Sequence, residues 1–377
     1  MALNKNIKDL RVLQIVPQIK PGGVERGVLE IFRFLSQNKI KSFIFCESID
    51  FGLLKKSEEN CIFTTGGIKF KDIKKYFYLN LKLKKIINDY RINLIHIASR
   101  APAIIFYNLI NQNPKIRYIT SLHNPYQGSY FKKYYNSFLL KGDAVIANSN
   151  YTKKFIEQNY KLINNIISIP RGVDLEYFNP NKFNNKKKII LKKKYKINQS
   201  DVVITMPSRF SIWKGHEEVI LFFNKIFQKI PYEFKLIFFV DSYDKKNNSY
   251  IKKICSKELL SNTILIPYTP NIVEIYALSD IIINNSSKPE GFGRTISESL
   301  AMNVVPIGAN HGGVREQLIK FNKNLLYRVN DHSSFLKALR HALKLIKSNN
   351  FNGRKYIKEN YSQKKMLRKT LQVYLGQ

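Results

Sequence analysis

Two glutamates and two glycines lie close together in the segment Lys288–Met302, KPEGFGRTISESLAM. Gly291 and Gly293 let the backbone approach a ligand, and a helix beginning after them presents free N–H groups and about half a positive charge, which suits a diphosphate. Carboxylates accept hydrogen bonds from paired sugar hydroxyls, each worth roughly 1.5 to 3 kcal/mol when desolvated. Glu290 in the loop and Glu298 one turn into the helix can therefore bind a transferred sugar and a ribose. Alternatively, Glu298 is a solvated helix residue and the glycines form only a cap.

Two cations follow a predicted strand in the segment Pro207–Glu217, PSRFSIWKGHE. Arg209 and Lys214 would lie at the carboxyl end of that strand, where they could neutralise the charge that develops on a departing diphosphate. In a chain this basic, an Arg and a Lys taken alone would more often be ordinary surface charges.

A glycine pair, Gly22-Gly23, lies between the first predicted strand and the first predicted helix. Such a turn can approach a phosphate or a sugar, although Gly-Gly pairs are common. The segment is not the dinucleotide-binding fingerprint, because the third glycine and the downstream acid are absent in register.

No resident cofactor or metal is expected. Asp241 and Asp244 have the wrong spacing for an Asp-x-Asp motif, and the cations described above can replace a metal ion. Cys46, Cys61 and Cys255 lack metal-ligand spacing, so we expect reduced, buried thiols.

The elements that must position these motifs follow an α/β pattern, because short aliphatic or β-branched runs alternate with amphipathic stretches. At 377 residues the chain suits two domains. We predict two Rossmann-like doubly wound domains at 1–178 and 179–355, and a closing C-terminal helix within 356–377 that returns towards the first domain. Two such domains would face each other across a cleft, and ligands bind at the carboxyl ends of their strands.

The predicted strands are Arg11–Val16, Lys41–Cys46, Leu94–Ala98, Arg117–Leu122, Ala144–Ala147, Ile166–Ile169, Val202–Met206, Lys235–Val240, Thr263–Pro267, Ile281–Asn284, Val304–Ile307 and Leu325–Arg328. The predicted helices are Val24–Ser36, Asp72–Asp89, Pro102–Asn111, Tyr130–Leu140, Thr152–Gln158, His216–Lys229, Ser249–Leu259, Ile272–Ser279, Arg294–Met302, Val314–Lys320, Ser333–Ile346 and Ser362–Leu375.

The net charge of +36 has three competing explanations: phosphate contacts with a nucleic acid, attraction to an anionic membrane, and compositional drift in a chain rich in Lys, Ile and Asn. Lysines spread along the whole chain, which favours drift. No nucleic-acid partner is expected, because no recognisable module interleaves basic and aromatic residues. Three basic helical segments are candidates for a membrane surface: Lys69–Lys85, Phe131–Lys141 and Lys182–Lys196.

No apolar stretch approaches the ~18 to 20 residues that cross a bilayer, and the apolar run near the N-terminus is too short for a signal peptide. We therefore expect a cytoplasmic protein, with the inner face of the cytoplasmic membrane as the candidate place of peripheral attachment.

The ordered set of motifs resembles glycosyltransferase family 4, a large family of retaining enzymes with the GT-B fold. The resemblance runs from residue 11 to about 320. The stretch Ile95–Ala103, IHIASRAPA, is similar to a branch found in alphaproteobacterial surface-polysaccharide and lipopolysaccharide enzymes. The motifs that carry the resemblance are Gly22-Gly23, Ser121-Leu-His123-Asn124, Ala147-Asn-Ser149, Ile169-Pro-Arg-Gly-Val-Asp174, Arg209 with Lys214-Gly215, and Glu290 with Glu298.

The resemblance implies retaining transfer of a hexosyl group from a nucleotide-diphosphate sugar to a glycan or lipid-linked acceptor, with the donor bound by the second domain. Arg209 and Lys214 would hold the diphosphate. Glu298 would bond the ribose, and Glu290 would contact the transferred sugar. Backbone amides of the segment Gly291-Phe292-Gly293-Arg294 would lie near that sugar or the phosphate.

In the first domain, which would bind the acceptor, the resemblance implies that Gly22 and Gly23 let their loop close over the donor. His123 would lie near the reacting carbon, and Ser99 and Arg100 would face the acceptor. His96 lies in the middle of an apolar strand and is interpreted as structural.

Two positions depart from the family pattern. Arg171 stands where Asn is common in the Pro-x-Gly-Val-Asp turn, and we expect it to affect the hinge rather than the chemistry. His123 is followed by Asn124, where some relatives have another His or Asp.

Two other functions remain as alternatives: a basic nucleic-acid-binding protein, and a GT-B enzyme of another reaction, such as a nucleotide-sugar epimerase or a sugar phosphorylase. The spacing of the Arg, Lys and two Glu residues favours glycosyl transfer, because function is read from the site and not from the fold.

Overall fold

The computed structural model describes residues 7–20, 22–125, 129–160, 165–227, 230, 232–240, 245–267, 269, 271–348 and 351–377, without the side chains of residues 8, 73 and 245–248. Two compact units make up the chain: Met1–Arg171 with Lys364–Gln377, and Gly172–Gln363. The structural division thus falls after Arg171 and again before Lys364, whereas the sequence placed it after residue 178 and at residue 356.

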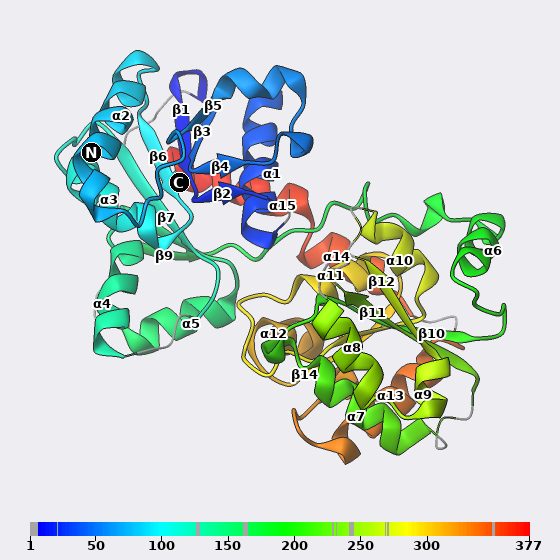
Figure 1. Cartoon of the computed structure of the whole chain (residues 1–377). Helices are drawn as coiled ribbons and strands as arrows, with labels where there is room; N and C mark the ends of the chain where they lie inside the picture. Colours follow the sequence, from blue (N-terminus) through cyan, green and yellow to red (C-terminus); the bar gives the residue numbers. More distant parts are fainter. Residues whose placement is uncertain are drawn as a thin grey trace. The chain divides into compact units, whose positions relative to one another are not determined.

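The first unit is built on a seven-stranded parallel sheet in the order β5-β3-β1-β6-β7-β8-β9 (Figure 1). Its central strands are buried along almost their whole length because helices cover both faces. The strands are β1 (Arg11–Ile15), β3 (Lys41–Cys46), β5 (Ile62–Thr64), β6 (Leu94–Ile97), β7 (Arg117–Leu122), β8 (Ala144–Ala147) and β9 (Asn165–Ser168), and a separate parallel pair is formed by β2 (Gln18–Ile19) and β4 (Ser48–Ile49).

Helices from opposite ends of the chain share one face of this sheet. Ile31 of α1 and Tyr374 of α15 pack into one buried cluster with Val12 of β1, while Leu83 of α2 and Phe106 of α3 belong to the cluster on the other face. The helices of this unit are α1 (Gly23–Gln37), α2 (Tyr76–Asp89), α3 (Arg100–Asn111), α4 (Tyr130–Ser137), α5 (Asn150–Asn159) and α15 (Gln363–Leu375).

The second unit has a six-stranded parallel sheet in the order β12-β11-β10-β13-β14-β15. The strands are β10 (Val202–Arg209), β11 (Phe234–Val240), β12 (Thr263–Pro267), β13 (Ile281–Asn284), β14 (Val305–Ala309) and β15 (Leu326–Tyr327). The helices are α6 (Asn185–Lys194), α7 (His216–Ile226), α8 (Lys245–Ile254), α9 (Lys257–Ser261), α10 (Ile272–Leu278), α11 (Arg294–Ala301), α12 (Gly312–Phe321), α13 (His332–Leu345) and α14 (Gly353–Asn360).

The α/β class with two parallel, Rossmann-like sheets is confirmed, and five strands have the predicted bounds: β3, β7, β8, β12 and β13. Other elements differ from the prediction, including the short strands β2 and β4, which were not predicted. The edge strand β5 and the helix α14 were not predicted, and the helix expected over Ser249–Leu259 is divided into α8 and α9, because the Ser256 side chain caps a new helix through the amide of Leu259. Within the described residues, no helix combines the length and the apolar character needed to cross a membrane.

Candidate active site

The motif loops of the second unit lie at one edge of its sheet. β10, β13 and β14 are neighbours in a parallel sheet, so their carboxyl ends point the same way. The loop before α7 follows β10, the loop before α11 follows β13, and the loop before α12 follows β14. This edge is where doubly wound sheets bind ligands.

An ion pair links the first two of these loops. Lys214 Nζ donates to Glu290 Oε1 at 2.8 Å, with the lysine side chain 19% and the glutamate side chain 14% exposed. The same carboxylate oxygen accepts a hydrogen bond from Asn284 Nδ2 at 3.2 Å and another from the Ser286 hydroxyl. Lys214 Nζ also lies 4.1 Å from the centroid of the Trp213 ring. The two residues predicted from separate motifs are therefore brought together.

Glu290 is held as a carboxylate. Burial acts to raise its pKa, but the charge of Lys214 and the three donated hydrogen bonds together lower the pKa below its ordinary value. All three donors converge on Oε1, so Oε2 keeps its capacity to accept hydrogen bonds from a ligand.

The second carboxylate, Glu298, is only 7% exposed. Its Oε2 accepts a hydrogen bond from the Tyr276 hydroxyl at 3.0 Å, and its Oε1 accepts one from Arg294 Nε at 3.3 Å. The alternative interpretation of Glu298 as a solvated helix residue is therefore wrong. These two contacts orient the Glu298 carboxylate.

The loop that carries Glu290 is fastened to the start of α12 by backbone contacts. The Gly313 amide donates to the Glu290 carbonyl at 2.8 Å, and a Cβ on Gly313 would lie 2.4 Å from Phe292 Cα. Gln317 is fully buried, and its Nε2 donates to the Phe292 carbonyl at 2.5 Å. Neither Gly313 nor Gln317 was predicted; the only signal in the sequence was the Gly312-Gly313 pair after a strand. Gly293 ends the loop as the N-terminal cap of α11, with φ of 84°.

Arg209 is the last residue of β10, and His216 is the first residue of α7. β10 extends to Arg209, beyond its predicted end at Met206, and the Arg209 side chain is exposed. His216 Nε2 donates to the Ser208 carbonyl at 3.1 Å, which ties the start of α7 to the end of β10. Burial lowers the pKa of His216 to about 4, so this ring is neutral. Arg209 and Lys214 thus lie at and just after the end of β10, before α7 begins.

In the first unit, the predicted glycines and the acceptor residues begin two helices. Gly22 is the N-terminal cap of α1, and Gly23 is its first residue. Ser99 is the N-terminal cap of α3, and Arg100 Nη1 donates to Asn136 Oδ1 at 3.1 Å in α4. These residues follow β1 and β6 and share the carboxyl edge of the first sheet.

His123 follows β7 at the same edge and contacts Arg171. Arg171 Nη2 lies 3.1 Å from His123 Nδ1, and the arginine side chain is buried. The sequence interpretation assigned Arg171 to the hinge rather than the chemistry. Arg171 is indeed the last residue before the division between the units, but its guanidinium is bound to a predicted site residue, which sequence reasoning missed.

His96 has the structural role that was expected. Its Nδ1 lies 2.6 Å from the Tyr374 hydroxyl, its Nε2 contacts the Ser121 hydroxyl, and the side chain is 3% exposed. Burial, with the charge of Arg171, lowers the pKa of His96 to about 3, so the ring is neutral.

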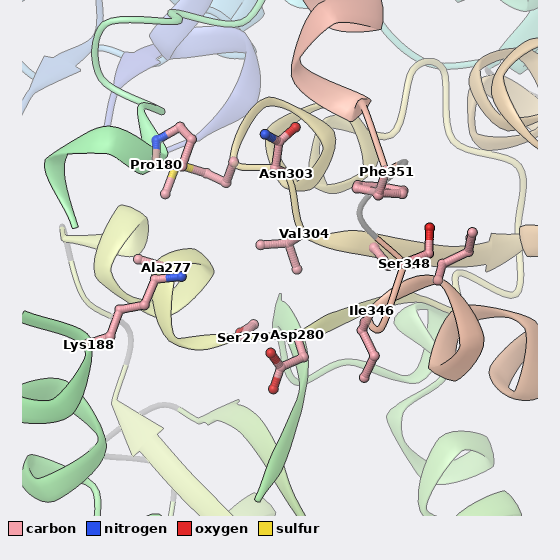
Figure 2. Close-up of a pocket in the computed structure, with 13 residues that line it drawn as sticks. Pro180, Lys188, Ala277, Ser279, Asp280, Asn303, Val304, Ile346, Ser348 and Phe351 are labelled. Atoms are coloured by element: carbon pink, nitrogen blue, oxygen red, sulfur yellow. The ribbon is translucent and has the colours of Figure 1, made fainter. Parts of the chain in front are cut away.

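A pocket of about 220 Å³ lies at the opposite edge of the second sheet (Figure 2). It is lined by Asp280, which precedes β13, by Asn303 and Val304, which precede β14, and by Phe351. Asp280 Oδ2 accepts the Val203 amide at 2.8 Å, so its carboxylate helps to begin β10. This pocket is separate from the predicted donor motifs.

No group of three or more His, Cys, Asp and Glu side chains that could hold a metal is present among the described residues. Asp241 and Asp244 lie outside the described residues. The absence of a cofactor and a metal therefore stays a prediction.

Two Rossmann-like domains, with buried carboxylates and a lysine at the carboxyl edge of the second, define the class of GT-B glycosyltransferases. Family comparison agrees: residues 21–177 match the family described as Glycosyltransferase Family 4, and residues 187–363 match Glycosyl transferases group 1. The chain belongs to glycosyltransferase family 4.

Solved structures with the same fold include a glycosyltransferase from Rickettsia africae, which is 29% identical, covers 97% of each chain and has a TM-score of 0.86. This relative fits the alphaproteobacterial branch suggested by the sequence. Anabaena HepE in complex with UDP-glucose is 15% identical, with 98% of this chain and 100% of that chain covered and a TM-score of 0.80. A trehalose synthase from Thermococcus litoralis is 23% identical over 98% of this chain and 90% of its own length.

Proposed function

We propose that this glycosyltransferase moves a hexosyl group from a nucleotide-diphosphate sugar to a hydroxyl of a glycan or lipid-linked acceptor, with retention of anomeric configuration. The observation that carries the proposal is the convergence of Lys214, Glu290 and Glu298 at the carboxyl edge of the second sheet. A cation and two oriented carboxylates at one edge of a sheet suit a ligand that combines a diphosphate with two sugars, and Anabaena HepE, which has the same fold, was solved in complex with UDP-glucose.

Lys214 can bind the leaving diphosphate while it keeps its ion pair with Glu290. An ammonium has three donors, and Glu290 Oε1 accepts one of them at 2.8 Å. The others can bind phosphate oxygens, together with Arg209 and the backbone amides at the start of α11, which carry about half a positive charge. These groups would stabilise the departing diphosphate in an oxocarbenium-like transition state.

Each of the two carboxylates would bind a different sugar of the donor. Glu290, in the loop, would accept hydrogen bonds from the transferred sugar, and Glu298, oriented by Tyr276 and Arg294, would accept them from the ribose hydroxyls. The acceptor hydroxyl would attack from the face that the diphosphate leaves, and a departing phosphate oxygen would take its proton. A pair of carboxylates flanking the anomeric carbon, as in glycosidases, is not required.

The natural acceptor we propose belongs to cell-envelope polysaccharide or lipopolysaccharide. The support is the similarity of the stretch Ile95–Ala103 to surface-polysaccharide enzymes and the 29% identity to the Rickettsia africae glycosyltransferase.

The proposal is tested by incubating the full chain with UDP-, GDP- and ADP-sugars and lipid-linked or polysaccharide acceptors, and by measuring nucleoside diphosphate release. We expect turnover with one nucleotide class, and a product whose anomeric configuration, read by NMR coupling constants, matches the donor. An inverted product would exclude retention, and free interconversion of the donor without transfer would favour an epimerase.

Peripheral membrane attachment is proposed for the helices α2 and α4 of the first unit. Phe77 of α2 is 73% exposed, and Tyr130 and Phe131 of α4 are 82% and 83% exposed. Exposed lysines adjoin them: Lys74 and Lys75 directly precede α2, and Lys132 and Lys133 lie on α4. Aromatic rings can enter the lipid headgroup region while each lysine near an anionic surface contributes about 1 kcal/mol. The third basic segment, 182–196, exposes Ile190 of α6 but lacks exposed aromatics of this size.

Flotation with vesicles of anionic lipid at low salt tests this attachment. We expect the protein to float with anionic vesicles and not with neutral ones, and Phe131→Ser and Phe77→Ser to reduce the bound fraction. Phe51→Ser is the matched control, since Phe51 is 58% exposed on a different segment of the same unit. No binding at low salt would reject the proposal.

A further inference from the structure

The contact between Arg171 and His123 determines which ring nitrogen of His123 carries a proton. Arg171 Nη2 lies 3.1 Å from His123 Nδ1. A guanidinium has five N–H donors and no acceptor, and it stays protonated in proteins. The arginine is therefore the donor, and Nδ1 accepts through its lone pair. His123 is then neutral, with its proton on Nε2.

The surroundings of His123 keep it in this neutral form. Burial lowers its pKa well below the ordinary value, and the charge of Arg171 and the nearby His96 ring act in the same direction. His96 is itself engaged by Tyr374 from α15 and Ser121 from β7, so it does not supply Nδ1 of His123 with an alternative donor.

The remaining polar atom of the ring, Nε2, is buried and has no hydrogen-bond partner among the residues that the structure describes. The backbone of His123 is fixed as well, because its carbonyl accepts Asn148 Nδ2 at 2.7 Å, and Asn148 Oδ1 accepts the Thr152 hydroxyl at 2.8 Å. A buried donor without a partner destabilises the protein, and a ligand oxygen that accepts its hydrogen bond would offset that cost.

The helix α1 lacks a side chain at the position where the Arg171 guanidinium packs against it. A Cβ on Gly27 would lie 1.9 Å from Arg171 Nη1, so glycine at this position leaves room for the arginine side chain. Gly27 lies inside α1, where glycine is less favourable than alanine. The local cost of Gly27 is explained by the contact between α1 and Arg171.

We infer that Arg171 is a positioning residue that fixes His123 as its Nε2–H tautomer, so that His123 donates a hydrogen bond to a substrate oxygen and does not act as a general base. The part of this inference that concerns substrate rests on the proposed glycosyl transfer. The tautomer belongs to the free protein and is measured without substrate.

The experiment is NMR of the full chain labelled with ¹⁵N-histidine, with the His123 signals assigned by their loss in His123→Gln. In the wild type we expect a protonated Nε2, an unprotonated Nδ1 and a pKa of His123 well below the ordinary histidine value. In Arg171→Met we expect a mixture of tautomers and a raised pKa of His123, because the arginine charge no longer disfavours the protonated ring. Arg340→Met, which removes an exposed arginine of the second unit, is the control.

Gly27→Ala is the second variant, because Arg171→Met could unfold the first unit. The added methyl group displaces the guanidinium but keeps its charge and favours the helix, so the protein should stay folded while the tautomers of His123 mix. A protonated Nδ1 in the wild type, or unchanged His123 signals in both variants, would overturn the inference.

A kinetic comparison tests whether the Nε2–H group of His123 contributes to the transfer reaction. Gln places its side-chain amide near the position of Nε2, and Asn places it near Nδ1. We expect His123→Gln to keep at least tenfold more of kcat than His123→Asn, and Arg171→Lys to recover part of the loss in Arg171→Met. Equal losses in His123→Gln and His123→Asn would overturn the donor role. Wild-type protein with the expected NMR signals but no transfer activity would instead refute the proposed function.

Discussion

At the scale of single residues, the account depends on the charges of Lys214 and Glu290. Both side chains are largely buried, and the carboxylate is ionised because the lysine and three hydrogen-bond donors offset the cost of burial. A buried carboxylate left without its cation would take up a proton instead. The contribution of this pair to the free energy of unfolding can therefore be measured separately from any effect on ligand binding.

Lys214→Met is expected to destabilise the protein by about 2 kcal/mol at pH 7, somewhat less than the 3–5 kcal/mol found when a fully buried pair is broken. The folded-state pKa of Glu290 is lowered in the wild type, so its stabilising effect is present above the unfolded pKa of about 4.3 and is lost as the pH falls through the folded value. The difference between wild type and variant should therefore shrink below pH 4.

Urea unfolding at pH 7 and pH 3.5 measures this difference. Lys320→Met is the control, because Lys320 is an exposed lysine of the same unit. A difference that is the same at both pH values would show that the lysine contributes by packing and not by charge.

At the scale of elements, the sequence predicted the strands best. β7, β8, β12 and β13 are short apolar runs bounded by polar or turn residues, so their limits are visible. β5 is a three-residue edge strand and α14 is mostly polar, so neither presents a periodic apolar pattern.

The predicted site residues were found because they belong to motifs within single loops. Their contacts were not predicted where they depend on tertiary packing. Gln317 reaches the carbonyl of Phe292, and Arg171 reaches His123 across many residues of sequence, so neither partner could be inferred from spacing.

Gly313→Ala tests the packing of the loop that carries Glu290 against α12. A Cβ at this position would lie 2.4 Å from Phe292 Cα and 2.5 Å from the Phe292 carbonyl oxygen, so the backbone of the loop must shift. We expect a loss of about 1–3 kcal/mol in unfolding free energy, as for overpacked cores, and weaker binding of nucleotide. Gly52→Ala, whose Cβ would meet only the Asp50 side chain at 3.2 Å, should change neither by a comparable amount.

At the scale of the whole molecule, the histidines give both units the same response to acid. All six have a pKa lowered below the ordinary value, chiefly by burial, and the pKa is about 3 for His96 and about 4 for His216. The unfolded chain binds protons at these rings below about pH 6.5, where the folded chain does not. Folding stability therefore falls as the pH drops from about 6.5 towards 4.

Thermal unfolding at constant ionic strength should show this fall, with a lower transition temperature at pH 5 than at pH 7. His96 and His123 belong to the first unit and His216 to the second, so transitions of both units should move. A transition temperature that stays constant from pH 7 to pH 5 would show that the rings are protonated in the folded protein.

The central claim, a nucleotide-diphosphate site at Lys214 and Glu298, is tested most directly by isothermal titration calorimetry of the full chain against UDP, GDP and ADP. The account predicts micromolar binding of one nucleotide, lost in Lys214→Ala and in Glu298→Ala. Lys320→Ala and Glu258→Ala, which remove exposed charges of the same unit, should retain it. A folded protein that binds none of the three nucleotides, or that binds one equally well in all four variants, would contradict the account.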